Sequence, residues 1–338
     1  MHKLRNITIA VLLFAPLFAG AQAVSDPVQY IIAPETPGPN ALVVIEAQGV
    51  GPFLGNANIR WTQDGKTVLE GVGERKFSFT TGALGSSSRI RINITSATAG
   101  SFSKELVFTP SLVNLVWEAD TTTPPFYRGK ALYSAGSPLK VVAFPSVFSG
   151  GSQISPSSLS YQWSRNSELL PAQSGLGRST LTLDGDQLQT QESVVVDINY
   201  GNARVARGEL VVPAVEPRIM LYSRDALHGT RWEAALPARI QLNVPELTVQ
   251  AEPFYFSMTS KKNNQLAFVW TLNGEDASGP DSSKGILTLR QSGGGVGSAS
   301  LGVSLQNNDT NAFIQQAAAA IEIVFGTQNS SVLNFFGL

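Results

Sequence analysis

The sequence contains no cysteine and only two histidines, His2 and His228. Disulfides, thiol nucleophiles and zinc or iron sites of the Cys/His type are therefore excluded, and every domain must rely on a packed core alone. Charged residues are also scarce, at 14% against about 25% in ordinary soluble domains. These absences predict a globular chain with a neutral, polar surface.

A large excess of either charge is missing as well. The chain has 24 basic and 25 acidic residues and a formal net charge of −1. Lys3 and Arg5 fall in the amino-terminal segment described next, which leaves 22 basic against 25 acidic residues and a net charge of −3. This net charge gives no sign of a basic surface that would bind nucleic acid or an anionic membrane, so we expect neither partner.

The amino terminus holds the one conspicuous apolar run, residues 7–18, between a basic start and the small-residue site at 21–23. This order is typical of a secretory signal. The run is shorter than the ~20 residues that a bilayer requires, and Pro16 interrupts it. Residues 1–23 are predicted to be a cleaved signal peptide. We expect a mature chain without a membrane span, outside the cytoplasm, either secreted or in the cell envelope.

One local pattern occurs three times, around Trp61, Trp163 and Trp270, at separations of 102 and 107 residues. An apolar residue lies two positions before each Trp, as strand alternation demands. Asp or Asn lies three positions after it and is followed by Gly or Ser, which favours a tight hairpin turn. Each copy therefore predicts a strand that enters a hairpin.

Further strand candidates keep the same order in all three copies. They lie before the Trp (41–47, 139–144, 247–251), after it (77–79, 181–183, 287–289; then 90–94, 194–198, 301–305), and at the close (105–108, 209–212, 322–325). Many short strands between turn residues favour antiparallel sandwiches over βαβ units. The predicted fold class is all-β, with three tandem immunoglobulin-like sandwiches.

The 315 residues after the signal are about three times the ~100 residues of one such sandwich. Predicted domains span residues 24–110, 111–214 and 215–326, followed by an apolar tail at 327–338. Residues 213–217 carry two prolines and predict a stiff connection. We expect three separately folding units in a row.

This pattern resembles the immunoglobulin-like and PKD-like superfamily of secreted bacterial β-sandwich modules, over residues 27–325. The resemblance implies that Trp61, Trp163 and Trp270 lie on the third strand of each domain and pack between its sheets. The sequence departs from the antibody pattern because both cysteines are missing, and from the PKD pattern because the Asp-rich turn is reduced. The resemblance implies an architecture shared by exported proteins, adhesins and stalks, and no single function.

Candidates for catalysis are weak. His228 has no nucleophile elbow beside it, and a sandwich has no strand-turn-helix to hold one. Paired carboxylates hydrolyse glycosides without histidine, but the Glu that recurs in the three closing strands is interpreted as a surface residue. We expect no enzyme activity and no catalytic residues, and a carboxylate-based hydrolase stays the remote alternative.

Asp184 and Asp186 flank a glycine and are a weak calcium candidate, interpreted instead as a plain turn. No cofactor is expected.

Aromatic residues mark two loops between strands, Phe126 and Tyr127 in the second domain and Trp232 in the third. Such rings stack on sugars or anchor a partner protein. The alternative is that they fold back on their own domain or its neighbour.

The carboxyl-terminal region gives two further expectations. Apolar residues at helical spacing in 306–320 predict a short helix, with Thr310 as its cap. Beyond a polar loop lie Leu333, Phe335, Phe336 and Leu338. Either this segment returns to the third domain, or it docks on a partner.

The leading hypothesis is a non-enzymatic exported structural or protein-interaction module at the cell surface, the envelope or an appendage. The second is a carbohydrate-binding protein or adhesin that uses the aromatic loops. The partner is expected to be a protein or a glycan.

The signal-peptide hypothesis gives the first testable prediction. Protein recovered outside the cytoplasm should begin at Val24 on amino-terminal sequencing. Recovery of a chain that still begins at Met1 would contradict it.

Overall fold

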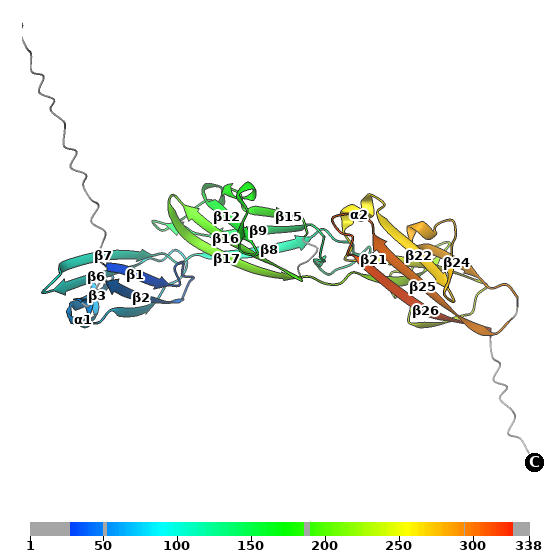
Figure 1. Cartoon of the computed structure of the whole chain (residues 1–338), viewed down its shortest axis with the longest axis horizontal. Helices are drawn as coiled ribbons and strands as arrows, with labels where there is room; N and C mark the ends of the chain where they lie inside the picture. Colours follow the sequence, from blue (N-terminus) through cyan, green and yellow to red (C-terminus); the bar gives the residue numbers. More distant parts are fainter. Residues whose placement is uncertain (1–27, 50–52, 186–189, 294, 327–338) are drawn as a thin grey trace, which may run out of the picture. The chain divides into compact units, whose positions relative to one another are not determined.

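A computed structural model describes residues 28–49, 53–185, 190–293 and 295–326. The described chain is almost entirely β-structure, in pairs of largely antiparallel sheets that form three sandwiches (Figure 1). Its internal contacts divide it into two compact units. The second unit contains all residues from Val107 onward, and so both the second and third sandwiches.

The first sandwich has one sheet of three strands and one of four. The three strands, in the order β1-β2-β5, are β1 (Val28–Ala33), β2 (Leu42–Gly49) and β5 (Lys76–Thr80). The four strands, in the order β4-β3-β6-β7, are β3 (Asn58–Gln63), β4 (Lys66–Val72), β6 (Ser88–Ser96) and β7 (Gly100–Phe108). One helical turn, α1 (Phe53–Asn56), precedes β3.

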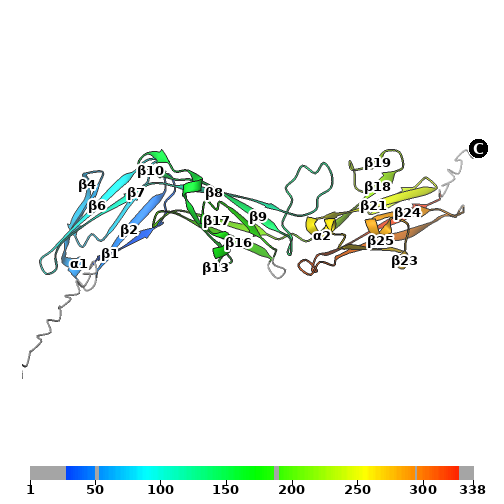
Figure 2. The ribbon, with the colours of Figure 1, turned by 90° about the horizontal axis from the view of Figure 1, so that it is seen from above.

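The second sandwich repeats this plan, and its two layers can be followed in Figure 2. One sheet, in the order β15-β9-β8, contains β8 (Leu112–Ala119), β9 (Leu139–Ser146) and β15 (Thr180–Leu183). The other, in the order β13-β12-β16-β17 with β14 beside β12, contains β12 (Ser160–Arg165), β13 (Glu168–Leu169), β14 (Gly175–Leu176), β16 (Gln191–Tyr200) and β17 (Ala203–Pro213). A small hairpin, β10 (Phe148–Ser149) with β11 (Ser152–Gln153), lies after β9.

The third sandwich has sheets of four and five strands. The first, β19-β18-β21-β24, contains β18 (Arg218–Asp225), β19 (Gly229–Thr230), β21 (Glu246–Phe254) and β24 (Ile286–Arg290). The second, β20-β26-β25-β22-β23, contains β20 (Arg239–Leu242), β22 (Leu266–Leu272), β23 (Glu275–Ala277), β25 (Gly297–Asn307) and β26 (Gln316–Phe325). Helix α2 (Met258–Lys262) connects the sheets, and β20 runs parallel to β26.

The three repeated tryptophans are buried in the three cores, with exposed fractions of 0%, 0% and 2%. Each indole N–H donates a hydrogen bond to a backbone carbonyl in the connection that leads to a strand of the opposite sheet, β5, β15 or β24. The acceptors are Glu74 O at 2.8 Å, Arg178 O at 2.8 Å and Ser282 O at 3.1 Å. The buried indole is therefore satisfied in the same way three times, as a buried polar group must be.

The Asp or Asn three residues after each Trp makes a second repeated contact. Asp64 Oδ1 accepts from the backbone N–H of Arg89 at 2.8 Å, and the N–H of Asp64 donates to the carbonyl of Arg89 at 2.9 Å. Asn166 bonds in the same two ways with Ser193, and Asn273 with Ser300. All three have a positive φ near 50°. The residue type thus suits both the hairpin turn and the bond to the next strand of the sheet.

The helix predicted for residues 306–320 is not there. Thr310–Ile314 form a turn, and β26 begins at Gln316 and pairs with β25 along ten residues. The edge of β25 presents a row of backbone N–H and C=O groups that need hydrogen-bond partners. Pairing with β26 supplies them, and it overrides the modest helix preference of the four consecutive alanines at 317–320. Phe313 is 57% exposed instead of covering a core.

The second and third sandwiches meet at a joint that the sequence did not predict. Thr122 exchanges backbone hydrogen bonds with Tyr255 and Phe256 at 2.8 and 2.7 Å, and Thr121 forms a bridge with Ser257. Gly136, at φ +81°, lies so close to residue 312 that a Cβ would come within 2.9 Å of Ala312 Cα. The connection at 213–217 is therefore only one of the links between these sandwiches.

Gln315 is the central side chain of this joint and is 1% exposed. Its Nε2 lies 2.9 Å from Ser134 Oγ and 2.7 Å from Ser137 Oγ, both fully buried. Its Oε1 accepts from the backbone N–H of Ser257 and from Asn307 Nδ2, both at 2.9 Å. One amide therefore satisfies polar groups from both sandwiches.

Replacing the first repeated tryptophan should affect the first sandwich alone. Trp61→Ala removes a large core side chain that stacks on Phe77 at 5.4 Å, so we expect a loss of roughly 3 to 5 kcal/mol in unfolding free energy. Limited proteolysis should then cut within residues 28–108 and spare the rest. Cleavage spread over all three sandwiches would contradict this expectation.

Replacing Gln315 should weaken the joint. Gln315→Ala takes the side-chain acceptor from the buried N–H of Ser257, a change that costs about 1 to 3 kcal/mol. Gln316→Ala, at the exposed next residue, is the matched control. Denaturant unfolding of both variants measures the difference, and equal stability would show that the joint contributes nothing.

Candidate functional site: an aromatic loop at the joint

The candidate site is the loop of residues 123–132, which connects β8 toward β9 and carries Phe126 and Tyr127. Near its ends, the loop is fixed to the second sandwich. Thr121 Oγ1 donates to the carbonyl of Leu132 at 2.8 Å, and Lys130 Nζ lies 3.2 Å from the centre of the Trp117 ring. Burial lowers the pKa of Lys130 from its ordinary value, and the charge of Glu118 partly opposes this.

Tyr127 fixes the middle of the loop to the third sandwich. Its ring meets the edge of Phe254 at 6.1 Å and 89°, and its hydroxyl lies 3.2 Å from the hydroxyl of Tyr255. The guanidinium of Arg218 lies 5.2 Å and 5.5 Å from the centres of the Phe254 and Tyr255 rings. This cluster is a cation–π and edge-to-face arrangement on the rim of the joint.

The hydroxyl of Tyr255 is perturbed by this cluster. Burial, and then the hydrogen bond with Tyr127, raise the pKa of the Tyr255 phenol above its ordinary value. The Tyr255 phenol thus stays protonated around neutral pH. Phe254 and Tyr255 are 5% and 4% exposed, so their rings support the loop and offer little surface of their own.

Phe126 lies beside this anchored tyrosine and is 89% exposed. The turn around it is tight, since the N–H of Tyr127 donates to the carbonyl of Pro124 at 3.3 Å. Its φ of +64° is uncommon for a residue with a side chain. The described loop therefore presents a large apolar ring to solvent from a backbone fixed on both sides.

The other predicted aromatic, Trp232, lies elsewhere. Its ring is 5.1 Å from that of Tyr222 and is only partly exposed, so it packs on its own sandwich. Leu333, Phe335, Phe336 and Leu338 lie outside the described residues. The structure thus brings Phe126 and Tyr127 to one site and does not add Trp232 to their described contacts.

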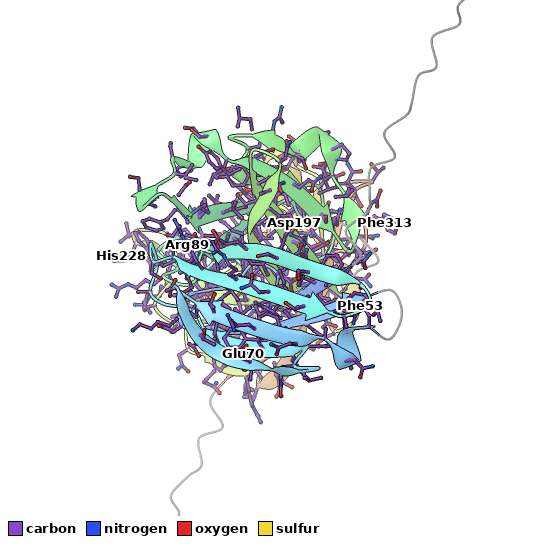
Figure 3. All side chains as sticks on the ribbon, turned by 90° about the vertical axis from the view of Figure 1, so that its left-hand side faces the viewer. Phe53, Glu70, Arg89, Asp197, His228 and Phe313 are labelled. Atoms are coloured by element: carbon purple, nitrogen blue, oxygen red, sulfur yellow. The ribbon has the colours of Figure 1, made fainter. Side chains whose placement is uncertain are left out.

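The weak chemical candidates have ordinary surroundings in the structure. His228 is 81% exposed (Figure 3). Its Nδ1 lies 3.0 Å from Asp225 Oδ1, which also accepts from two backbone N–H groups of the same turn. The recurring closing-strand glutamates form exposed ion pairs with arginines: Arg91–Glu105, Arg207–Glu209 and Arg239–Glu322.

For metal binding, Asp186 lies outside the described residues. Within the described ranges, no group of three or more His, Cys, Asp or Glu side chains is placed to hold an ion. Those ranges also contain no helix of the length and apolarity needed to span a bilayer.

Comparisons with known proteins identify no family for this chain. No protein-family model matches the chain, and no curated protein matches it. Among solved structures, the three N-terminal domains of the bacteriophage RB49 highly immunogenic outer capsid protein are 11% identical, cover 89% of this chain and 98% of that one, and give a TM-score of 0.27. The central fibronectin-III array of RIM-binding protein is 12% identical, with coverage of 89% and 98% and a TM-score of 0.27.

A third similar structure is SGBP-B of the Bacteroides ovatus mixed-linkage glucan utilization locus, in complex with a mixed-linkage heptasaccharide. It is 12% identical, covers 88% of this chain and 70% of that one, and has a TM-score of 0.22. With such low identities and scores, the immunoglobulin-like assignment depends on the strand order and pairing within each sandwich.

Sequence reasoning identified the loop but missed its supports. Arg218, Phe254 and Tyr255 come from a different sandwich, about 90 to 130 residues further along the chain. The run Phe254-Tyr255-Phe256 is visible in the sequence as three adjacent aromatics, but it does not reveal which loop it contacts.

Proposed function

We propose that the protein is an exported, non-enzymatic interaction module of the secreted bacterial sandwich type, at the cell surface, the envelope or an appendage. In this proposal residues 1–23 are removed on export, and the domains at 24–110, 111–214 and 215–326 present the aromatic loop. The observation that carries it is the 89% exposed ring of Phe126 on a loop anchored to two sandwiches.

A fixed, exposed aromatic suits a binding anchor for a physical reason. A flexible loop loses conformational entropy when a partner orders it, whereas a loop already fixed by Tyr127 and Lys130 loses less. Aromatic anchors of this kind carry a large share of the binding free energy at protein interfaces.

The chemistry around Phe126 favours a protein partner over a glycan. Sugar sites combine a stacking ring with side chains that hydrogen-bond to hydroxyl groups. Here the hydroxyl of Tyr127 is already paired with that of Tyr255, and the neighbouring rings are buried. Contact through Phe126 is therefore mainly apolar, as in the centre of a protein interface.

Replacing the exposed ring should weaken binding to the producing cells. Phe126→Ala should reduce the affinity of labelled protein for those cells about 30-fold or more, because truncating a hot-spot aromatic costs about 2 kcal/mol or more. Leu227→Ala is the matched control, since Leu227 is 90% exposed on another loop. Both variants should melt like the parent chain.

Treatment of the cells distinguishes the two partner classes. Protease digestion of the cell surface should abolish binding, whereas periodate oxidation of its sugars should not. The opposite result would favour the glycan alternative. Equal binding by the parent chain and Phe126→Ala would remove the loop from the function.

A further inference from the structure

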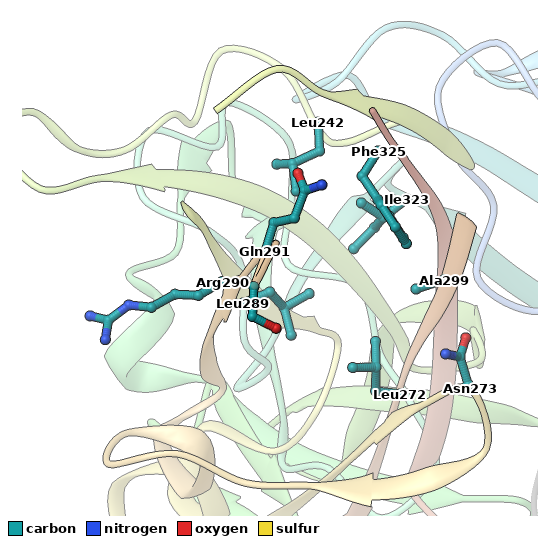
Figure 4. Close-up of a pocket in the computed structure, with 10 residues that line it drawn as sticks. Leu242, Leu272, Asn273, Leu289, Arg290, Gln291, Ala299, Ile323 and Phe325 are labelled. Carbon is teal, nitrogen blue, oxygen red and sulfur yellow. The ribbon is translucent and has the colours of Figure 1, made fainter. Parts of the chain in front are cut away.

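The third sandwich has an apolar pocket of ≈ 260 Å³ at one end, where β22, β24 and β26 finish and β25 begins (Figure 4). Its apolar wall consists of Leu242, Leu272, Leu289, Ala299, Ile323 and Phe325. The wall opens to solvent, with polar residues such as Asn273 and Gln291 at its rim. The apolar side chains of this pocket stay partly in contact with water, so they gain less free energy from burial than those in the rest of the core.

The internal repeat shows what the same place holds in the second sandwich. Counting from the repeated Trp and its hydrogen-bonded Asn, Leu272 corresponds to Arg165 and Ala299 to Glu192. At the close of the repeat, Ile323 pairs with Ala299 as Val212 pairs with Glu192, and both Ile323 and Val212 are buried. Phe325, two residues further along, is only half-buried.

In the second sandwich this end is filled. Arg165 Nε donates to Glu192 Oε2 at 2.7 Å, and the hydroxyl of Tyr133 donates to Glu192 Oε1 at 2.8 Å. Tyr133 is fully buried and belongs to the core of that sandwich. Its aromatic ring comes from the segment between β8 and β9, outside the repeated strands.

The third sandwich uses the corresponding segment differently. Between β18 and β21 the chain forms β20, which pairs with β26, and Leu242 at its end becomes a wall of the pocket. Leu272 and Ala299 also replace the Arg165–Glu192 ion pair of the second sandwich, so the pocket has no charged group to bond with a hydroxyl. An apolar ring without a hydroxyl is therefore the complementary occupant.

We propose that the pocket receives a phenylalanine ring of Phe335 or Phe336 from the carboxyl-terminal segment of the same molecule. The ring would occupy the place that Tyr133 takes in the second sandwich. The inference goes beyond the proposed function and does not rest on it.

The chain route suits this occupant. Phe325 is a pocket wall, and the next residue, Gly326, has a φ of +77° and lies so close to residues 295–296 that a Cβ would meet Gly295 O at 2.8 Å. The backbone thus turns at the lip of the pocket. Residues 327–334 separate this turn from Phe335. When extended, a segment of this length reaches about 25 Å, which is enough to return Phe335 to the pocket. A tether this short gives an effective concentration in the millimolar range, which favours the same molecule over a second copy.

The lack of native cysteine allows a direct test on the full mature chain. Asn334→Cys places a thiol just before the two phenylalanines in the sequence, and Ser292→Cys places one at the pocket rim. Ser304→Cys, on the outer face of the same sandwich, is the matched control. Mild oxidation should form the 292–334 disulfide within one molecule at least tenfold faster than the 304–334 disulfide, because only thiols held near disulfide geometry react readily.

Two further variants test the occupant and the pocket separately. Phe335→Ser with Phe336→Ser should abolish the rate difference while the strands stay intact. Leu272→Arg with Ala299→Glu, which restores the residues of the second sandwich, should do the same from the pocket side. Each variant retains the fold if its circular dichroism spectrum matches that of the parent.

The outcomes are distinguishable. Equal disulfide rates at 292 and 304 would overturn the proposal. Disulfides between molecules at position 292, increasing with protein concentration, would overturn it in favour of a second copy as the occupant. Loss of Phe126-dependent cell binding belongs to the proposed function and leaves these rates unchanged.

Discussion

The buried tryptophan of each repeat is the constraint on which the other features depend. An indole buried between two sheets must place its N–H on an acceptor, and all three find a backbone carbonyl 12 to 15 residues further along. This bond fixes the connection that crosses from one sheet to the other. The Asp or Asn three residues later then fixes the neighbouring strand of the same sheet. Two polar contacts per sandwich thereby position strands from both layers, in a chain that has no disulfides.

The second and third sandwiches add a further polar centre. Gln315 satisfies buried groups of both, which makes their contact dependent on orientation, because amide hydrogen bonds are directional. The aromatic loop lies on the rim of this contact, so its position depends on two sandwiches at once. That dependence is the physical basis for regarding Phe126 as a preorganised anchor.

The ends of the sandwiches show how one repeat is adapted. The same corner holds an Arg–Glu pair with a tyrosine in the second sandwich and an apolar hollow in the third. Repeated strands supply the layers, whereas the segments between them decide what closes each end. Variation in those segments gives each copy its own surface while the cores remain alike.

The sequence by itself determined the all-β class, the three repeats and most strand positions, because alternation and turn residues are local signals. It also identified the Phe126 loop. Tertiary structure decided that residues 316–320 form a strand, since the partner strand β25 outweighs the helix preference of alanine. It alone decided that Tyr127 meets Phe254 and Tyr255, and that Gln315 meets Ser134 and Ser137. Those contacts join residues more than 120 positions apart, and no local pattern encodes which distant side chain will satisfy a buried polar group.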